Sequence, residues 1–84
     1  MMTQRDKLLA KIQNNPKAVT FQQIDTLLRQ HGFELVHVAG SHHQYQRQGI
    51  HTVTIARHGS RVSEREVRLV LGAVELARLR ESDL

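Results

Sequence analysis

Histidines are the residues of this sequence best suited to chemistry. The 84 residues contain six histidines and no cysteine, which excludes disulfides, zinc ribbons and thiol nucleophiles. Four of the histidines fall within seventeen positions, and they are His42, His43, His51 and His58. An imidazole has an ordinary pKa of about 6.5, so it can accept or donate a proton near neutral pH. We therefore expect a functional site in this segment.

The chain is basic. Twelve Lys and Arg residues against eight Asp and Glu give a net charge of +4, and the sequence pI is near 10.4. An anionic partner such as a nucleic acid is therefore expected. Five arginines could form a stripe suited to bidentate phosphate contacts, namely Arg47, Arg57, Arg61, Arg65 and Arg68. A solvated helix face, with Glu64 and Glu66 offsetting the charge, explains these arginines equally well.

Three capping-box patterns mark the expected starts of helices. The pairs are Thr3 with Asp6, Thr20 with Gln23, and Ser63 with Glu66. Apolar residues follow each pair at helical spacing. The first helix should end at Asn14 to Pro16, and the second at the C-cap glycine Gly32.

Three β-rich segments lie between the second and third helices. They span residues 33–38, 42–47 and 51–56. The predicted order is α-α-β-β-β-α, and the expected fold is an α+β sandwich of a three-stranded antiparallel sheet with helices on one face. We expect residues 1–84 to form a single domain, with a helical extension at 1–19 and a core at 20–79.

The register of the hairpin decides which histidine faces outward. A two-residue loop at Gln48 and Gly49 would place Tyr45 and Val53 on opposite faces. A three-residue loop, 48–50, pairs Tyr45 with Val53 and His43 with Ile55, which keeps the apolar residues together. That register sets His43 on the core side and leaves a polar open face consisting of His42, Gln44, Gln46, Thr52 and Thr54. A slip of one residue would exchange the roles of His42 and His43.

Two motifs and the segment before them resemble the HicA toxin family. The motifs are Gly-Ser-His-His-Gln-Tyr at 40–45 and Val-Thr-Ile-Ala-Arg-His at 53–58, and the segment is Leu-Leu-Arg-Gln-His-Gly-Phe at 27–33. The resemblance implies a double-stranded-RNA-binding-like fold, cleavage of messenger RNA without a metal or other cofactor, and neutralisation by a HicB antitoxin that covers the catalytic histidine. His42 stands at the matching position, and residues 5–9 and 14–17 resemble a longer subgroup. Ala56 stands where proline is usual, and Ser63 to Glu66 replace the common Gly-Thr start of the last helix.

On this reading, His42 is the catalytic residue and His43 is the alternate. The expected RNA-binding residues are Gly40, Ser41, Gln44, Arg47, Arg57, His58 and Arg61. Arg57 and His58 could also be a solvated turn, or His58 a second catalytic acid. A zinc site of His42, His51 and His58 is disfavoured, because the spacings match no familiar template and no carboxylate lies between residues 37 and 61.

The main alternative is a non-catalytic RNA- or DNA-binding regulatory module. Ala56, which departs from the usual proline of the family that the chain resembles, is the feature that supports this alternative. Leu69 and Leu76 lie off the main apolar stripe of the last helix, so they mark either a partner surface or wider packing. No segment is apolar enough to span a membrane and residues 1–17 are too polar for a signal peptide, so a cytoplasmic protein is expected. The expected partners are messenger RNA and a HicB-like antitoxin in a hetero-oligomer.

Overall fold

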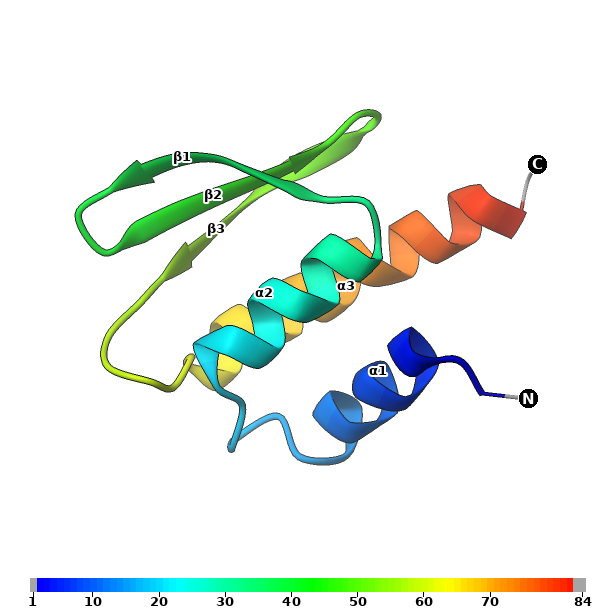
Figure 1. The fold of residues 1–84 in the computed structure, drawn as a ribbon, viewed down its shortest axis with the longest axis horizontal. Coiled ribbons are helices and arrows are strands. Elements are labelled where there is room, and N and C mark those ends of the chain that lie inside the picture. The colour runs from blue at the N-terminus through cyan, green and yellow to red at the C-terminus, as the bar shows by residue number, and fades with distance from the viewer. Residues whose placement is uncertain (1, 83–84) are drawn as a thin grey trace.

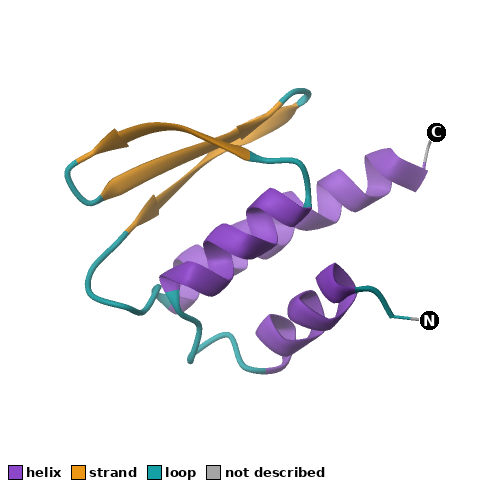
Figure 2. Cartoon of the chain, viewed as in Figure 1, coloured by secondary structure: helices purple, strands orange, loops and turns teal. Residues whose placement is uncertain are grey.

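The computed structural model describes residues 2–82, and its elements follow the predicted order (Figures 1 and 2). The elements are α1 (Gln4–Asn14), α2 (Phe21–Gln30), β1 (Glu34–Ala39), β2 (His42–Arg47), β3 (Ile50–Ala56) and α3 (Glu64–Ser82). The strands form one antiparallel sheet in the order β1-β2-β3, so β2 is the central strand. The helices lie on one side of the sheet and leave its other face open (Figure 1). The predicted α+β layout is confirmed.

The core lies between the sheet and the helices. Tyr45 and Ile55 from the sheet are fully buried. The helix residues buried with them are Ile24, Leu27 and Leu28 of α2 and Val67, Val70 and Val74 of α3. Ile12 and Val19, which precede α2, belong to the same core cluster and are each 1% exposed. The segment before α2 therefore adds to the core instead of lying apart from it.

Local capping starts the helices, but the third cap differs from the prediction. The Thr3 and Thr20 capping boxes are complete. At α3, the Glu66 amide donates to the Ser63 hydroxyl at 3.3 Å, which is the ordinary N-cap bond. The Glu66 carboxylate does not return to the Ser63 backbone; it accepts from the Ala56 amide at 2.6 Å and from the Ser63 hydroxyl at 2.9 Å. The predicted third box is thus only half formed, because a strand amide takes the carboxylate.

The β2–β3 hairpin has the predicted pairing but not the predicted loop. Tyr45 pairs with Val53 and His43 with Ile55, which confirms the register. Arg47 pairs with Ile50, so the loop is the two residues 48–49 rather than three. A β-bulge between these pairs sets Gln46 against residues 51–52 and restores the apolar face that a regular two-residue hairpin would have lost.

A second β-bulge interrupts β1. Leu35 pairs with Tyr45, and the next pair along the strand is His37 with Gln44, so Val36 is the extra residue. Alternation would have turned His37 to the same side as Leu35. The bulge instead gives His37 the same face as Gln44.

Ionic and polar contacts tie the helices together at the end of the sheet where β2 finishes. His31 is 1% exposed; its Nδ1 donates to the Leu27 carbonyl at 2.8 Å, and its Nε2 accepts from Arg78 at 3.3 Å. Burial holds the pKa of His31 below its ordinary value. The second guanidinium nitrogen of Arg78 donates to Asp6 of α1 at 2.8 Å. The sequence did not predict that His31 is buried, because His31 follows the apolar residues of α2 at a position where a helix normally ends at the surface.

Candidate active site

His42 stands on the open face at the start of the central strand. It is the first residue of β2 and is exposed to solvent. Its register partners are Ala39 on β1 and Ala56 on β3, so a small side chain flanks it on each side. Neither methyl group is large enough to shield the imidazole. A bulky anionic substrate can therefore approach the ring from above and from both sides.

The turn before His42 is built by Gly40 and Ser41. Ala39 pairs with His42, which leaves these two residues as the loop. Gly40 has φ of 59°, whereas no residue other than glycine has a positive φ among residues 2–82. This sign pattern fits a type II′ turn, which needs glycine at its first central position. The Arg57 amide donates to the Ser41 carbonyl at 2.7 Å and holds the turn against the end of β3.

His43 faces the helices, as the register requires. Its ring centroid lies 4.8 Å from that of Phe21 on α2, with the two planes tilted by 59°. Its Nδ1 lies 3.2 Å from the Ser41 carbonyl and donates to it. The Arg57 guanidinium lies over the same Phe21 ring, 4.7 Å from its centroid. His43 is thus half-buried and engaged in packing, while His42 is free to meet a ligand.

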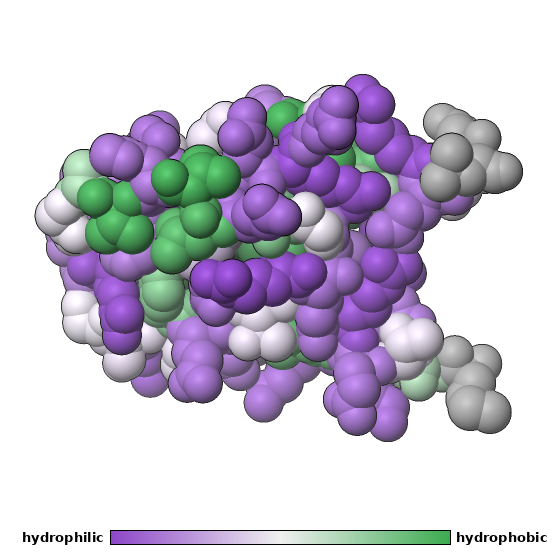
Figure 3. Space-filling view, turned by 45° about the horizontal axis from the view of Figure 1, so that its top comes forward, coloured by the Kyte–Doolittle hydropathy of each residue, from purple (hydrophilic) through white to green (hydrophobic). Residues whose placement is uncertain are grey.

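Polar side chains follow His42 along the open face of the sheet. Gln44 is the next outward residue of β2, and it pairs with His37 on β1 and with Thr54 on β3. Glu34 pairs with Gln46 and so brings its carboxylate to the opposite end of this face. The surface seen obliquely from the side of the sheet is mainly hydrophilic, but an apolar cluster lies at the left, the end of the molecule that carries the turn between β1 and β2 (Figures 1 and 3). The polar groups beside His42 on the open face are therefore those of Gln44 and its partners His37 and Thr54.

The predicted RNA-binding residues divide between the two ends of the sheet. Arg57, His58 and Arg61 are exposed in the loop after β3, at the His42 end. Isolated bridges from Arg61 to His58 and to Thr20 give this loop a defined path. These loop residues lie with Gly40, Ser41 and Gln44 near His42.

Arg47 lies at the opposite end of β2 from His42. Five residue steps along a strand correspond to about 17 Å. Its guanidinium donates to the His31 carbonyl at 2.6 Å and lies 3.5 Å from Glu81. The hydrogen bond from Arg5, together with Arg47, lowers the pKa of Glu81 to about 2. Arg47 is therefore occupied in joining β2 to the helices.

Two of the five arginines of the predicted stripe, Arg65 and Arg68, lie on α3. Arg65 is exposed in the first turn of the helix. Arg68 pairs with Glu64 at 2.7 Å, one helical turn away, and its side chain is 66% exposed. The Arg68–Glu64 pair agrees with a solvated helix face, the alternative to an arginine stripe.

Metal-ligand and membrane-spanning patterns are both missing from residues 2–82. No group of three or more His, Asp or Glu side chains in that range is placed to hold a metal ion. His51 stands near the opposite end of β3 from Ala56 and hence from His42. No helix in that range is long and apolar enough to cross a membrane.

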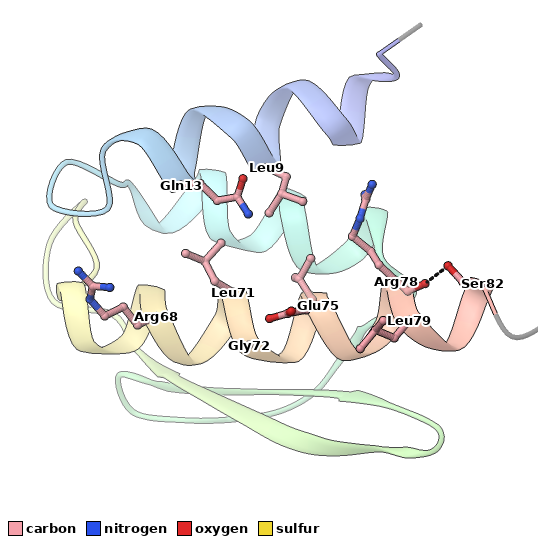
Figure 4. A pocket seen from close by; sticks show the side chains of 10 residues that line it. Leu9, Gln13, Arg68, Leu71, Gly72, Glu75, Arg78, Leu79 and Ser82 are labelled. Carbon is pink, nitrogen blue, oxygen red and sulfur yellow. Dashed lines mark hydrogen bonds between the residues drawn. The ribbon is translucent and has the colours of Figure 1, made fainter.

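A pocket lies away from the His42 end, between α1 and α3. Its volume is about 540 Å³, and Leu9 and Gln13 of α1 face Leu71 of α3 across it (Figure 4). Leu69 and Leu76 are 55% and 43% exposed on α3. They do not pack in the core, so the wider-packing alternative is wrong for them. Their role as a partner surface stays a prediction.

The fold and site define a small basic α+β protein that presents one histidine on an open, polar sheet face. The family model described as "HicA toxin of bacterial toxin-antitoxin" matches residues 21–72, which is more than half of the chain and includes the whole sheet. The chain therefore belongs to the HicA toxin family of bacterial toxin–antitoxin systems. Searches of curated proteins and of solved structures each found no match.

Proposed function

We propose that this toxin is an endoribonuclease that binds messenger RNA in the cytoplasm and cleaves it with His42 as the general base. The observation that carries the proposal is the position of His42, exposed on the central strand between two alanines. The matched family supports a toxin, and the basic charge of the chain supports an RNA substrate. His43 is the less suitable base because it faces the helices and packs on Phe21.

The chemistry needs little beyond a positioned imidazole. RNA supplies its own nucleophile, the ribose 2′-hydroxyl. A neutral His42 accepts the 2′-hydroxyl proton as this oxygen attacks phosphorus, and the bond to the 5′ oxygen breaks. The products are a 2′,3′-cyclic phosphate and a 5′-hydroxyl. A single general base contributes about 10²- to 10⁴-fold, so cleavage should be slow.

Substrate binding is assigned to the end of the sheet that carries His42. Arg57 and Arg61 are exposed there and can contact phosphates of the bound strand. Gly40, Ser41, Gln44 and His58 border the same region and can contact the nucleotides next to the scissile bond. Arg47 was predicted in this set, but its contacts with His31 and Glu81 support a structural role instead.

Control is assigned to a HicB-like antitoxin that covers His42. A basic protein of net charge +4 should associate rapidly with an acidic partner, since complementary charge raises association rates. Inhibition by occlusion predicts that His42 reacts with diethyl pyrocarbonate in the free toxin and is protected in the complex. Unchanged reactivity in the complex would show that inhibition works by another route.

Two substitutions test the catalytic assignment. His42→Ala removes an exposed ring, so its stability should change by no more than about 0.5 kcal/mol, and RNA cleavage and toxicity should disappear. His43→Ala removes the ring that packs on Phe21 and should cost about 1 kcal/mol of stability. The assay is cleavage of a defined RNA by the purified toxin in the presence of chelator, with urea unfolding of each variant.

The same assay distinguishes the remaining possibilities. RNA binding should survive in His42→Ala, because Arg57 and Arg61 are untouched. If folded His42→Ala cleaves like the wild type while folded His43→Ala does not, the catalytic assignment moves to His43. If the wild type binds RNA or DNA and leaves RNA intact, the protein is a non-catalytic binding module.

A further inference from the structure

We infer that His37 is a second catalytic residue, the general acid that protonates the departing 5′ oxygen of the RNA. The inference rests on the proposed ribonuclease activity and concerns the same face of the sheet. His37 is exposed on β1, and its register partner is Gln44, the outward-facing neighbour of His42 on β2. The two exposed imidazoles therefore share one open face.

The β1 bulge is what brings His37 to this face. Leu35 faces the helices opposite Tyr45, and regular alternation would turn residue 37 the same way. The extra residue Val36 shifts the register by one, so His37 turns outward with Gln44. Bulges are often found beside active sites, where they redirect a side chain. Here the redirected side chain is an imidazole.

The register also fixes the spacing of the two histidines. Ala39 pairs with His42, and His37 pairs with Gln44, so His37 and His42 are diagonal neighbours across adjacent strands. Diagonal neighbours in an antiparallel sheet are about 7–8 Å apart, which long and aromatic side chains can span. On β1, the residue opposite His42 is Ala39, which contributes only a methyl group to the space between the two histidines. A phosphodiester can enter this space and contact one ring on each side, with the Gln44 amide beside it.

The cleavage step balances with these two groups. His42 takes the proton from the 2′-hydroxyl as the 2′ oxygen bonds to phosphorus. The bond from phosphorus to the 5′ oxygen breaks, and that oxygen takes a proton from the His37 imidazolium. The step leaves His42 protonated and His37 neutral, and proton exchange with water restores both rings. Protonating the leaving oxygen avoids expelling an alkoxide, which is the harder half of the reaction without an acid.

His37 is better placed for this role than the other exposed histidines. His51 stands near the β2–β3 turn, toward the opposite end of β3 from Ala56, the residue that pairs with His42. His58 lies in the loop after β3, outside the three strands, and forms an isolated bridge with Arg61. The hydrogen-bonded sheet holds His37 in one register relative to His42.

A substrate with a better leaving group tests the assignment. The probe is a short RNA with a single cleavable site whose 5′ bridging oxygen is replaced by sulfur, compared with the all-oxygen RNA under single-turnover conditions. A thiolate leaves without protonation, so it needs no general acid. His37→Gln should slow cleavage of the oxygen substrate by about 100-fold or more and leave the sulfur substrate close to the wild-type rate. His42→Ala should slow both substrates, because the attacking group is the same.

The controls separate failure of this inference from failure of the proposed function. His51→Gln removes another exposed imidazole of the sheet and should cleave both substrates at the wild-type rate. The inference is overturned if His37→Gln slows both substrates equally or neither, or if His58→Gln shows the sulfur rescue instead. A wild-type protein that cleaves neither substrate overturns the ribonuclease proposal itself.

Discussion

The bond between Glu66 and Ala56 should hold the end of β3 beside His42, and its contribution can be measured. Ala56 is the register partner of His42, and its amide donates to the Glu66 carboxylate at 2.6 Å. Hydrogen bonds to charged groups contribute about 1.5–3 kcal/mol. This site is partly buried and water can replace the carboxylate, so we expect Glu66→Ala to lower the free energy of unfolding by about 1.5 kcal/mol.

A double-mutant cycle with Ala56→Pro isolates that bond. Proline has no amide hydrogen to donate, so Ala56→Pro removes the donor of this bond. In the proline background, Glu66→Ala should cost only about 0.5 kcal/mol, which reflects the lost contact with Ser63. The expected coupling energy is therefore about 1 kcal/mol. Glu64→Ala removes a pair with Arg68, whose side chain is 66% exposed, and serves as a matched control costing at most about 0.5 kcal/mol.

Urea unfolding at pH 7 measures each corner of the cycle. The midpoint should shift with an unchanged m-value, because the same surface is exposed on unfolding. In thermal unfolding, a loss of 1.5 kcal/mol corresponds to a fall in Tm of about 6–12 °C for a domain of this size. A coupling energy below about 0.3 kcal/mol would refute the reasoning, since independent sites add within that range. In that case the carboxylate would merely lie near the strand.

Three further predictions concern pH, the core and RNA binding. Burial lowers the pKa of His31, so the unfolded chain binds a proton at this residue more readily than the folded protein does. The free energy of unfolding should therefore fall as the pH decreases below about 6.5. Urea midpoints measured from pH 8 to 5 should show this fall in the wild type but not in His31→Gln. Tyr45→Phe removes the hydroxyl that donates to Asp25 at 2.6 Å and should lower the free energy of unfolding in urea by about 1 kcal/mol. An unchanged midpoint would mean that solvent already satisfies the Asp25 carboxylate. Affinity for single-stranded RNA should fall with salt, and Arg57→Ala and Arg61→Ala should each reduce the log–log slope by about 0.7; an unchanged slope in both variants would remove these arginines from the interface.

Local patterns in the sequence were sufficient for the element order and for part of the site. Two of the capping boxes formed as predicted, because their partners are only three residues apart. The requirement to bury Tyr45 with Val53 and Ile55 was also enough to predict the strand pairing and hence the outward direction of His42. A one-residue slip between β2 and β3 would have placed Tyr45 on the opposite face of the sheet from Val53 and Ile55, so this register was strongly specified.

The two β-bulges could not be predicted from the sequence. The apolar pattern predicts which residues pair, but an extra residue in a strand changes the pairing without changing composition. The loop after β2 was therefore expected to have three residues, whereas the structure combines a two-residue loop with a bulge. For the same reason, alternation alone could not show that His37 shares a face with His42.

Long-range partners were decided only by the tertiary structure. Arg47 was grouped with the RNA-binding arginines because its charge is visible in the sequence, yet the fold brings it to the His31 carbonyl and to Glu81. Glu66 fits a local capping box, yet the end of β3 brings it a competing amide ten residues away. The sequence contains every hydrogen-bond donor and acceptor of the chain, and partners that are only a few residues apart can be predicted from it. Which distant groups meet depends on how the layers pack, because most buried polar groups are hydrogen-bonded and their partners come from whichever elements the fold brings together.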